Sequence, residues 1–350
     1  MGPQPELPAG SHPLPGGSDG PNLRQSGGVP WTRPSHLTFF VELPGTELEA
    51  LLSDAVLATL AQARAGLAVA MLDLQPERAV ALRRAAAHGV ELTAWLVLDP
   101  EDGYWLTVDN ARHAAQRWQQ VREWLAAEAL TVQAVGLDIE LPEPDAVALM
   151  RAPGQAVRQL WRQRRRRGAV AQAVADYRTL VAELRASGLR VETYQFPLVV
   201  EERAAASTLL QRVLGIADVR GDREVLMLYR SVLPQPWGHW LIDLWGGDAE
   251  AIAVGISGGG VASLQGAFAN RLLDLEALRR ELARARHFGL PLYVFSLEGC
   301  IAADMLVDLL DQPLPAVARP RAPVALRGLR WLLRTALRVD RVWGRLGRRT

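Results

Sequence analysis

Two acids, Asp138 and Glu140, stand close together in the stretch Val135–Pro142. They come at the end of a short apolar run and are two residues apart, so on a β-strand both side chains point to the same face. Two carboxyl groups held close together do not both ionise easily, and the pKa of one of them rises. A carboxylic acid with a raised pKa can protonate a glycosidic oxygen near neutral pH, so the pair predicts acid catalysis on a carbohydrate.

Polar residues also end most of the other short apolar runs. Acids come at the ends of four of these runs, and other polar residues end three more: Glu42, Asp73, Asp99 and Glu298, then Tyr194 with Gln195, Tyr229 with Arg230, and Ser257. If the runs are parallel strands, these side chains meet at one edge of the sheet. Two roles stay open for Glu42 and Glu298. Either one is a nucleophile opposite Glu140, or one pairs with Arg230 in a structural ion pair.

The elements that would position these residues alternate along the whole body of the chain. Short β-rich runs are expected at Leu37–Leu43, Leu67–Asp73, Val90–Leu98, Gln133–Ile139, Arg190–Phe196, Glu224–Arg230, Ala251–Ile256 and Pro291–Leu297, with helices between them, for example over Glu47–Arg64 and Glu201–Leu214. Most runs are continuously apolar, which is typical of parallel strands covered on both faces. Eight such units predict a (β/α)8 TIM barrel over residues 36–314. An open doubly wound sheet is the alternative, but no Rossmann glycine fingerprint follows the first run.

Two motifs in these positions resemble the chitinase-like glycoside hydrolases of family 18. These enzymes are (β/α)8 barrels whose fourth strand ends in DxxDxDxE and whose sixth strand carries Met-x-Tyr, and here the matches are Asp138-Ile139-Glu140 and Met227-Leu228-Tyr229. The resemblance implies that Glu140 is the general acid. It also implies that Asp138 orients a substrate N-acetyl group that acts as the nucleophile, with Tyr229 in support. The two earlier acids of the family motif are replaced by Gln133 and Gly136, and Arg230 stands where the family has an acid.

Aromatic residues accompany the same predicted opening. Trp105 follows the third strand and Trp237 the sixth, each in a loop expected on the side of the strand ends. Flat aromatic faces are suited to stacking on sugar rings. The residues that we expect to bind substrate are Glu42, Asp99, Trp105, Tyr194, Gln195, Arg230, Trp237 and Glu298.

The composition excludes several other classes of chemistry. The sequence has no lysine, so all 39 basic residues are arginine, and lysine-dependent Schiff-base and Walker-type nucleotide sites are ruled out. The single cysteine, Cys300, excludes a disulfide framework and any multi-cysteine metal site. We expect no cofactor. The glycines after Ser257 leave open a phosphate-binding isomerase or lyase, and the strand-end acids with His239 leave open a site for Mg²⁺ or Mn²⁺.

The two ends of the chain differ from the body. Residues 1–35 are rich in Pro, Gly and Ser and contain no apolar segment of the kind found in a signal peptide. We expect them to form a disordered arm. Residues 315–350 hold ten Arg and a single acid, Asp340, and their spacing after Pro323 predicts an amphipathic helix. Such a helix either lies on an anionic membrane surface or docks its apolar face on the body; nucleic acid is a weaker option. Cysteine usage is consistent with the cytoplasm, with peripheral membrane contact through the tail.

From these observations we expect a glycoside hydrolase-like barrel that acts on or binds a carbohydrate. Glu140 would be the general acid, with Asp138 and Tyr229 in support. The alternative is a barrel without catalytic activity that binds a glycan or another partner and is recruited to an anionic membrane by its tail.

Overall fold

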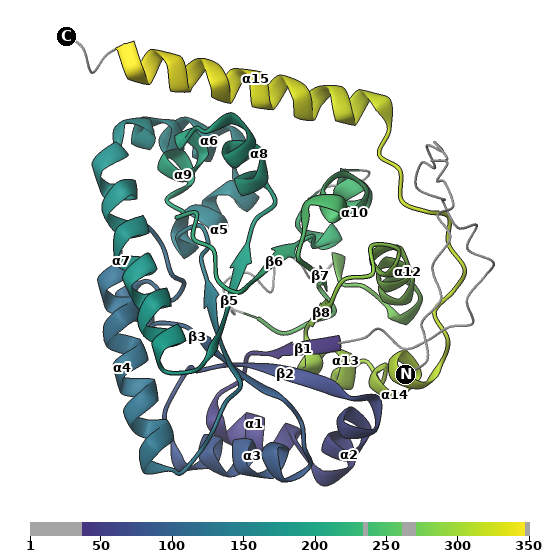
Figure 1. Cartoon of the computed structure of the whole chain (residues 1–350). Coiled ribbons are helices and arrows are strands. Elements are labelled where there is room, and N and C mark those ends of the chain that lie inside the picture. Colours follow the sequence, from purple (N-terminus) through teal and green to yellow (C-terminus); the bar gives the residue numbers. More distant parts are fainter. Residues whose placement is uncertain (1–36, 234–236, 261–270, 347–350) are drawn as a thin grey trace, which may run out of the picture. The chain divides into compact units, whose positions relative to one another are not determined.

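The computed structural model describes residues 37–233, 237–260 and 271–346, with the backbone alone at residue 153 and at residues 343–346. The predicted N-terminal arm lies outside the described residues. Eight parallel strands form a closed barrel, each paired with its neighbours in sequence and the last paired with the first. They are β1 (Leu37–Val41), β2 (Ala65–Ala70), β3 (Leu92–Leu96), β4 (Ala134–Asp138), β5 (Arg190–Gln195), β6 (Arg223–Met227), β7 (Ala251–Gly255) and β8 (Leu292–Phe295). The predicted (β/α)8 barrel is confirmed (Figure 1).

Helices surround this barrel, as Figure 1 shows. They are α1 (Gly45–Leu51), α2 (Asp54–Ala63), α3 (Pro76–Ala87), α4 (Ala111–Ala127), α5 (Glu143–Arg151), α6 (Pro153–Trp161), α7 (Arg167–Ala186), α8 (Leu198–Ala205), α9 (Leu209–Leu214), α10 (Leu241–Trp245), α12 (Leu275–Arg286), α13 (Leu297–Ala302), α14 (Leu306–Asp311) and α15 (Val324–Leu346). Short 3-10 segments are η1 (Pro100–Asp102), η2 (Arg162–Arg165), η3 (Arg230–Val232), η4 (Trp237–Trp240) and η5 (Gly246–Asp248). None of the described helices is long and apolar enough to span a membrane.

Two predicted helices are each divided in the structure. The stretch Glu47–Arg64 forms α1 and α2, because Ser53 begins a new helix by accepting a hydrogen bond from the N–H of Val56 (3.4 Å). The stretch Glu201–Leu214 forms α8 and α9, which are separated at Ala206, a residue in the left-handed region. Sequence periodicity carries little information about such breaks, because both halves keep the same apolar period.

The interior of the barrel is filled by side chains of complementary size. Large aromatic rings of β1, β3, β5 and β8 face alanines of β2 and β7: Phe40, Trp95, Tyr194 and Tyr293 against Ala68, Ala70, Ala251 and Ala253. The rings of Phe40 and Tyr194 meet edge to face, with centroids 4.9 Å apart. This aromatic layer closes the middle of the barrel and separates two polar regions, one at each end of the strands.

Candidate active site

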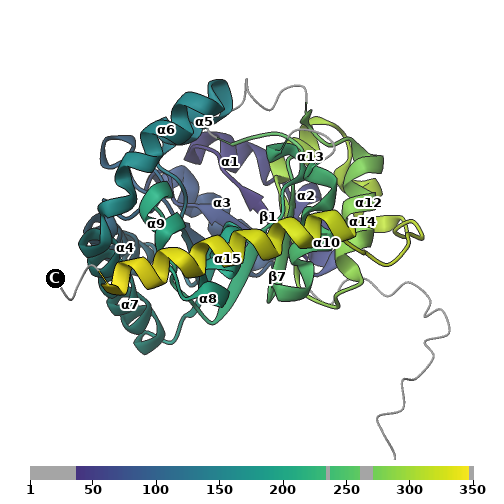
Figure 2. The ribbon, with the colours of Figure 1, turned by 90° about the horizontal axis from the view of Figure 1, so that it is seen from above.

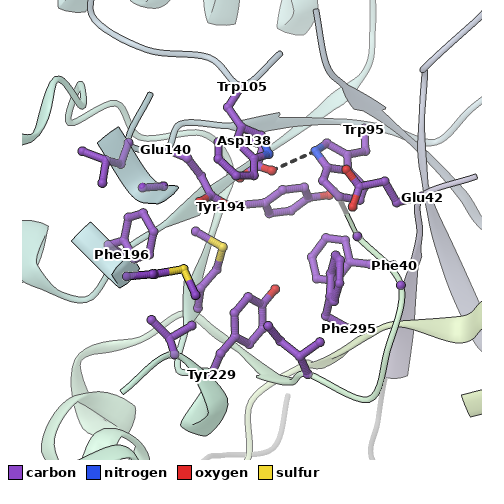
Figure 3. Close-up of a pocket in the computed structure, with 18 of the residues that line it drawn as sticks. Phe40, Glu42, Trp95, Trp105, Asp138, Glu140, Tyr194, Phe196, Tyr229 and Phe295 are labelled. Atoms are coloured by element: carbon purple, nitrogen blue, oxygen red, sulfur yellow. Dashed lines mark hydrogen bonds between the residues drawn. The ribbon is translucent and has the colours of Figure 1, made fainter. Parts of the chain in front are cut away.

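A cavity of about 170 Å³ opens at the carboxyl ends of the strands (Figure 3). Three acids line it, from the ends of β1 and β4: Glu42, Asp138 and Glu140. The remaining wall is apolar and largely aromatic: Phe40, Trp95, Trp105, Tyr194, Phe196, Tyr229 and Phe295, with Met227, Val232, Ile256 and four residues at or near α5, Leu141, Ala146, Leu149 and Met150. Gly259 and Gly260 complete it. Of the described residues that line the cavity, none is Arg or His.

Asp138 and Glu140 come from the end of β4 and its continuation. Ile139 forms a bridge with Leu106 of the loop after β3, and the N–H of Glu140 donates to the carbonyl oxygen of Leu106 (3.0 Å). The strand is thus extended by two residues, which keeps both carboxyl groups on the inner face of the barrel. Trp95 Nε1–H of β3 donates to Asp138 Oδ2 (3.1 Å), whereas Asp138 Oδ1 receives no hydrogen bond from a donor among the described residues.

The two carboxyl groups of this pair interact directly. Two buried carboxyl groups this close together do not both ionise easily, so each affects the protonation of the other. Burial, then the charge of Glu140, raise the pKa of Asp138 well above its ordinary value. Burial and the charge of Glu42 raise the pKa of Glu140 to about 8. Both shifts favour a protonated form of the pair at neutral pH.

Glu42, directly after β1 and 7% exposed, provides the third carboxyl group of the cavity. The hydroxyl of Tyr104 donates to its Oε1, and its own N–H donates to Glu298 Oε1 (3.4 Å). Burial raises the pKa of Glu42 to about 8, and the charges of Glu298 and Asp138 add to the effect. No cation compensates Glu42 in the wall of the cavity that the structure describes.

The loop between β3 and α4 brings Tyr104 and Trp105 to the cavity. Asn110 ties this loop together, because its Nδ2 donates to the carbonyl oxygens of Asp102 and Trp105 and its Oδ1 accepts from the N–H of Thr107. Tyr104 has φ 62°, in the left-handed region that a bulky residue rarely adopts. This turn directs its hydroxyl toward Glu42.

Tyr229 lies opposite the acids, at the end of β6 (Figure 3). Its ring packs beside that of Phe295, with centroids 6.0 Å apart, and burial raises its pKa well above 10, as do the charges of Asp138, Glu140 and Glu42. Its hydroxyl therefore stays protonated and can donate a hydrogen bond to a ligand in the cavity.

The structure brings together six of the residues that the sequence singled out. Those lining the cavity are Glu42, Trp105, Asp138, Glu140, Tyr194 and Tyr229. Sequence reasoning missed Phe40, Trp95 and Phe295, and it considered Tyr104 as a loop aromatic for sugar rings but not as a partner of Glu42. Trp95 could have been found from strand alternation, since it falls on the inward positions of β3. The contact of Tyr104 with Glu42 depends on a loop turn that has no sequence period.

Five other predicted residues lie outside the lining. Asp99 is exposed and 3.7 Å from Arg117; Gln195 is buried, and its Nε2 donates to the carbonyl oxygens of Ala217 and Val219. Gln195 faces away from the cavity because neighbours on a strand point to opposite faces, and Tyr194 takes the inner one. Trp237 is 51% exposed in η4.

Arg230 and Glu298 are the remaining two. Arg230 lies 3.7 Å from Glu281 of α12, and the structure pairs it with neither Glu42 nor Glu298. Glu298 stands behind the glycine turn after β7, where a Cβ added to Gly259 would come within 2.1 Å of its Oε1. The backbone of Gly260 hydrogen-bonds Glu298. This turn therefore already binds the carboxyl group of Glu298, which disfavours the binding of a phosphate at the same place.

Among the described residues, no group of three or more His, Cys, Asp or Glu is arranged to hold a metal ion. Asp73, one of the acids considered as a ligand, accepts hydrogen bonds from Arg78 (Nε, 3.1 Å; Nη2, 3.0 Å) and from the N–H of Gly45 (2.9 Å). These bonds lower its pKa and fix it in the wall between β2 and α3. His239 lies in η4, outside the lining of the cavity.

No family model matches the sequence, and no curated protein matches it. Among solved structures, the chain is similar to a GH18 chitinase from Pseudoalteromonas aurantia, at 9% identity and a TM-score of 0.42, over 79% of this chain and 98% of that one. It is also similar to a mutant tryptophan synthase α-subunit (D110N) from Pyrococcus furiosus, at 11% identity and a TM-score of 0.40 (81% and 98% covered). A D-allulose 3-epimerase from Methylomonas sp. has 13% identity and a TM-score of 0.41, with 81% and 98% covered. At these values the likeness does not extend to substrates or to individual residues.

Proposed function

We propose that the cavity binds a carbohydrate and that Glu140 cleaves a glycosidic bond as general acid. The observation that carries this proposal is the placement of the Asp138 and Glu140 carboxyl groups in a cavity lined by aromatic rings and free of cations in its described wall, where burial raises both pKa values. Glu140 is the partly exposed member of the pair, so its proton is accessible from the cavity. The rings of Trp105, Phe196 and Tyr229 offer apolar faces for sugar rings.

In the proposed reaction Glu140 donates its proton to the glycosidic oxygen as the bond from that oxygen to the anomeric carbon breaks. Glu42 is a weak nucleophile at neutral pH, because its pKa of about 8 keeps it protonated. The resemblance to family 18 supplies the alternative: the acetamido oxygen of the substrate bonds to the anomeric carbon, oriented by Asp138. Tyr229 donates a hydrogen bond to that group. The Glu140 carboxylate then takes a proton from the water that completes hydrolysis.

A second candidate is a binding barrel without turnover, and one contact favours it. Gly136 stands where the family motif has an acid, and a Cβ there would be 2.2 Å from the hydroxyl oxygen of Tyr194. Tyr194 therefore occupies the space beneath Asp138 that an acid side chain would need. Asp138 is held by the Trp95 indole instead.

One experiment distinguishes a hydrolase from a barrel that binds without turnover. Release of 4-methylumbelliferone is measured from a panel of glycosides that includes N-acetylglucosaminides, for the wild type, Glu140→Gln and the control Glu47→Gln on the exposed first turn of α1. Hydrolysis predicts turnover in the wild type and the control and its loss in Glu140→Gln. Binding is followed by tryptophan fluorescence, because Trp95 and Trp105 line the cavity. Saccharide binding without turnover in all three proteins would support the binding barrel, and neither binding nor turnover would contradict both candidates.

A further inference from the structure

The C-terminal helix α15 docks on the body through a different face from the one that the sequence predicted. The sequence offered two alternatives: an amphipathic helix on a membrane, or one that docks its apolar face on the body and leaves its arginines in water. In the structure α15 lies along α8, and Figures 1 and 2 show it crossing the outside of the helical layer. Arg330 and Arg334 are on its docked face, and most of its exposed apolar residues are on its free face.

The docked face is fixed by a buried acid of α8. The side chain of Glu201 is fully buried, and both its oxygens accept from α15: Oε1 from Arg330 and Oε2 from Arg334 (2.5 Å). Trp245 Nε1–H donates to the same carboxylate (2.7 Å), and the Arg330 guanidinium lies 5.4 Å from the centre of the Trp245 ring. A buried carboxylate needs such compensation, so these two arginines hold the helix on the barrel.

The second half of the helix is docked in the same way. Leu337 is 1% exposed, and Asp340 accepts hydrogen bonds from Arg212 Nη2 (2.6 Å) and from the Ser207 hydroxyl (3.3 Å). Arg167 Nη2 lies 3.7 Å from the same carboxylate. Charged contacts near both ends therefore fix the rotation of α15 about its own axis.

This rotation leaves an apolar stripe without a partner among the described residues. Its members are exposed by half or more: Val324 (75%), Trp331 (61%), Leu332 (56%), Val339 (52%) and Val342 (54%). At about 100° per residue they fall within a sector of roughly 100°, on the side opposite Leu337. Arg327 and Arg338 are exposed and follow along one edge of the sector. We call this set of seven residues the outer face.

A second exposed surface of similar composition lies on α6 and η2. Val157 (54%) and Trp161 (49%) of α6 are exposed, together with Arg158, Arg162 and Arg165. The buried side chain of Arg212 links η2 to α15, because it donates both to the carbonyl oxygen of Arg164 and to Asp340.

We propose that the outer face of α15 lies on the surface of an anionic lipid bilayer. From Val324 to Val342 the stripe is about 27 Å long at 1.5 Å per residue, and it belongs to a convex helix, which suits a flat interface better than a groove. Trp331 has the amphipathic ring that favours the headgroup level, and the arginines at the edge complement acidic lipid headgroups. A second copy of the chain would bring the arginines of two outer faces together, and their repulsion disfavours self-association.

The test uses the full-length protein and vesicles of phosphatidylcholine with and without 30% phosphatidylserine. We expect wild-type protein to co-sediment with the anionic vesicles and weakly with neutral ones. Trp331→Ser/Leu332→Ser should abolish this binding, whereas the control Val80→Ser/Val307→Ser, at exposed apolar sites of α3 and α14, should keep it. Arg327→Gln/Arg338→Gln should lower the partition coefficient by about thirtyfold, and Arg122→Gln/Arg178→Gln, at exposed sites of α4 and α7, should leave it nearly unchanged.

The alternatives give different results. Equal binding by wild type and Trp331→Ser/Leu332→Ser, or no binding of wild type to either vesicle, would overturn the proposal. So would a dimer without lipid, detected by sedimentation velocity and lost in the same variant, since this would assign the outer face to a second copy. None of these readouts depends on glycoside turnover, so the lipid proposal and the proposed function fail separately.

Discussion

The two ends of the barrel interior hold acids of the same kind in opposite electrostatic settings. At the amino ends of the strands, Glu192 of β5 is 1% exposed and lies between two arginines, Arg190 (3.2 Å) and Arg223 (3.3 Å). Tyr194 donates to its other oxygen (3.3 Å), and Arg223 also donates to the hydroxyl of Tyr293 (3.2 Å). The charge of this acid is compensated, so its role is to complete the packing of the barrel.

At the carboxyl ends, Glu42, Asp138 and Glu140 meet only neutral donors in the described wall, the Trp95 indole and the Tyr104 hydroxyl. Burial therefore raises their pKa values instead of being offset by a cation. The comparison shows that the buried acids at the two ends differ in whether an arginine compensates them. What distinguishes the candidate active site is buried carboxyl groups without arginines, on a scaffold that supplies arginines elsewhere.

Replacing Glu140, at the carboxyl ends of the strands, should have the largest effect, and it should lower turnover without lowering stability. General acid catalysis typically contributes about 10²–10⁴-fold, so Glu140→Gln should lower kcat/KM by that factor on any glycoside that the wild type cleaves. Its stability should stay equal or rise, since a neutral amide replaces an acid whose ionisation burial opposes. The measurement pairs initial rates with urea unfolding, and a fall in stability together with intact turnover would reverse the assignment.

Replacing Glu192 at the other end should have the complementary effect. Glu192→Gln leaves Arg190 and Arg223 without their common carboxylate, and the free energy of unfolding should fall by about 1–3 kcal/mol, less than for fully buried pairs because both arginines are partly exposed. Ligand binding by the remaining folded protein should be unchanged, as shown by tryptophan fluorescence. Loss of binding without loss of stability would contradict the division between the two ends.

The sequence predicted the scaffold better than the site. Eight apolar runs, each between helical segments, were sufficient for the barrel, because strand periodicity and chain order determine this fold. Asp138 and Glu140 were also predictable, since spacing along one strand decides which face they share. The Tyr104–Glu42 contact, the Trp95–Asp138 bond and the pairing of Arg230 with Glu281 were not, because each joins elements whose relative position is set by packing.

The C-terminal tail, too, could be predicted from the sequence only in part. Its amphipathic helix was predictable from the arginine spacing, but which face docks was not. That choice depends on Glu201, a buried acid of α8 that is 129 residues away from Arg330 in the chain.

A steric substitution tests the packing of Tyr194 against Gly136 in the middle of the barrel. Gly136→Ala places a Cβ 2.2 Å from the Tyr194 hydroxyl oxygen and 2.5 Å from the adjacent ring carbon, so the ring must move, and the free energy of unfolding should fall by about 1–3 kcal/mol. Gly154→Ala in α6 is the matched control, because its Cβ would meet nothing within 4 Å. Equal stability of the two variants would show that Tyr194 is not held against Gly136.

The pH dependence of stability should show the uncompensated acids directly. The pKa values of Glu42 and Glu140 in the folded protein are about 8, above the ordinary value of 4.5. Their protonated forms therefore contribute their full stabilisation of the folded state below about pH 4.5. It is lost as the pH rises toward about 8, by at most about 1.4 kcal/mol per pH unit for each group. Glu42→Gln/Glu140→Gln should therefore be increasingly more stable than the wild type over this range. A difference independent of pH would contradict the assignment.

Infrared difference spectroscopy tests the central claim most directly, because a protonated carboxylic acid has a C=O stretching band that a carboxylate lacks. The spectrum of wild type minus Glu140→Gln should contain this band at pH 7 and lose it as the pH is raised through about 8. The corresponding difference for Glu192→Gln should show a carboxylate at pH 7, as its two arginine partners imply. A carboxylate band for Glu140 at pH 7 would contradict the account, since the acid would then have no proton to donate.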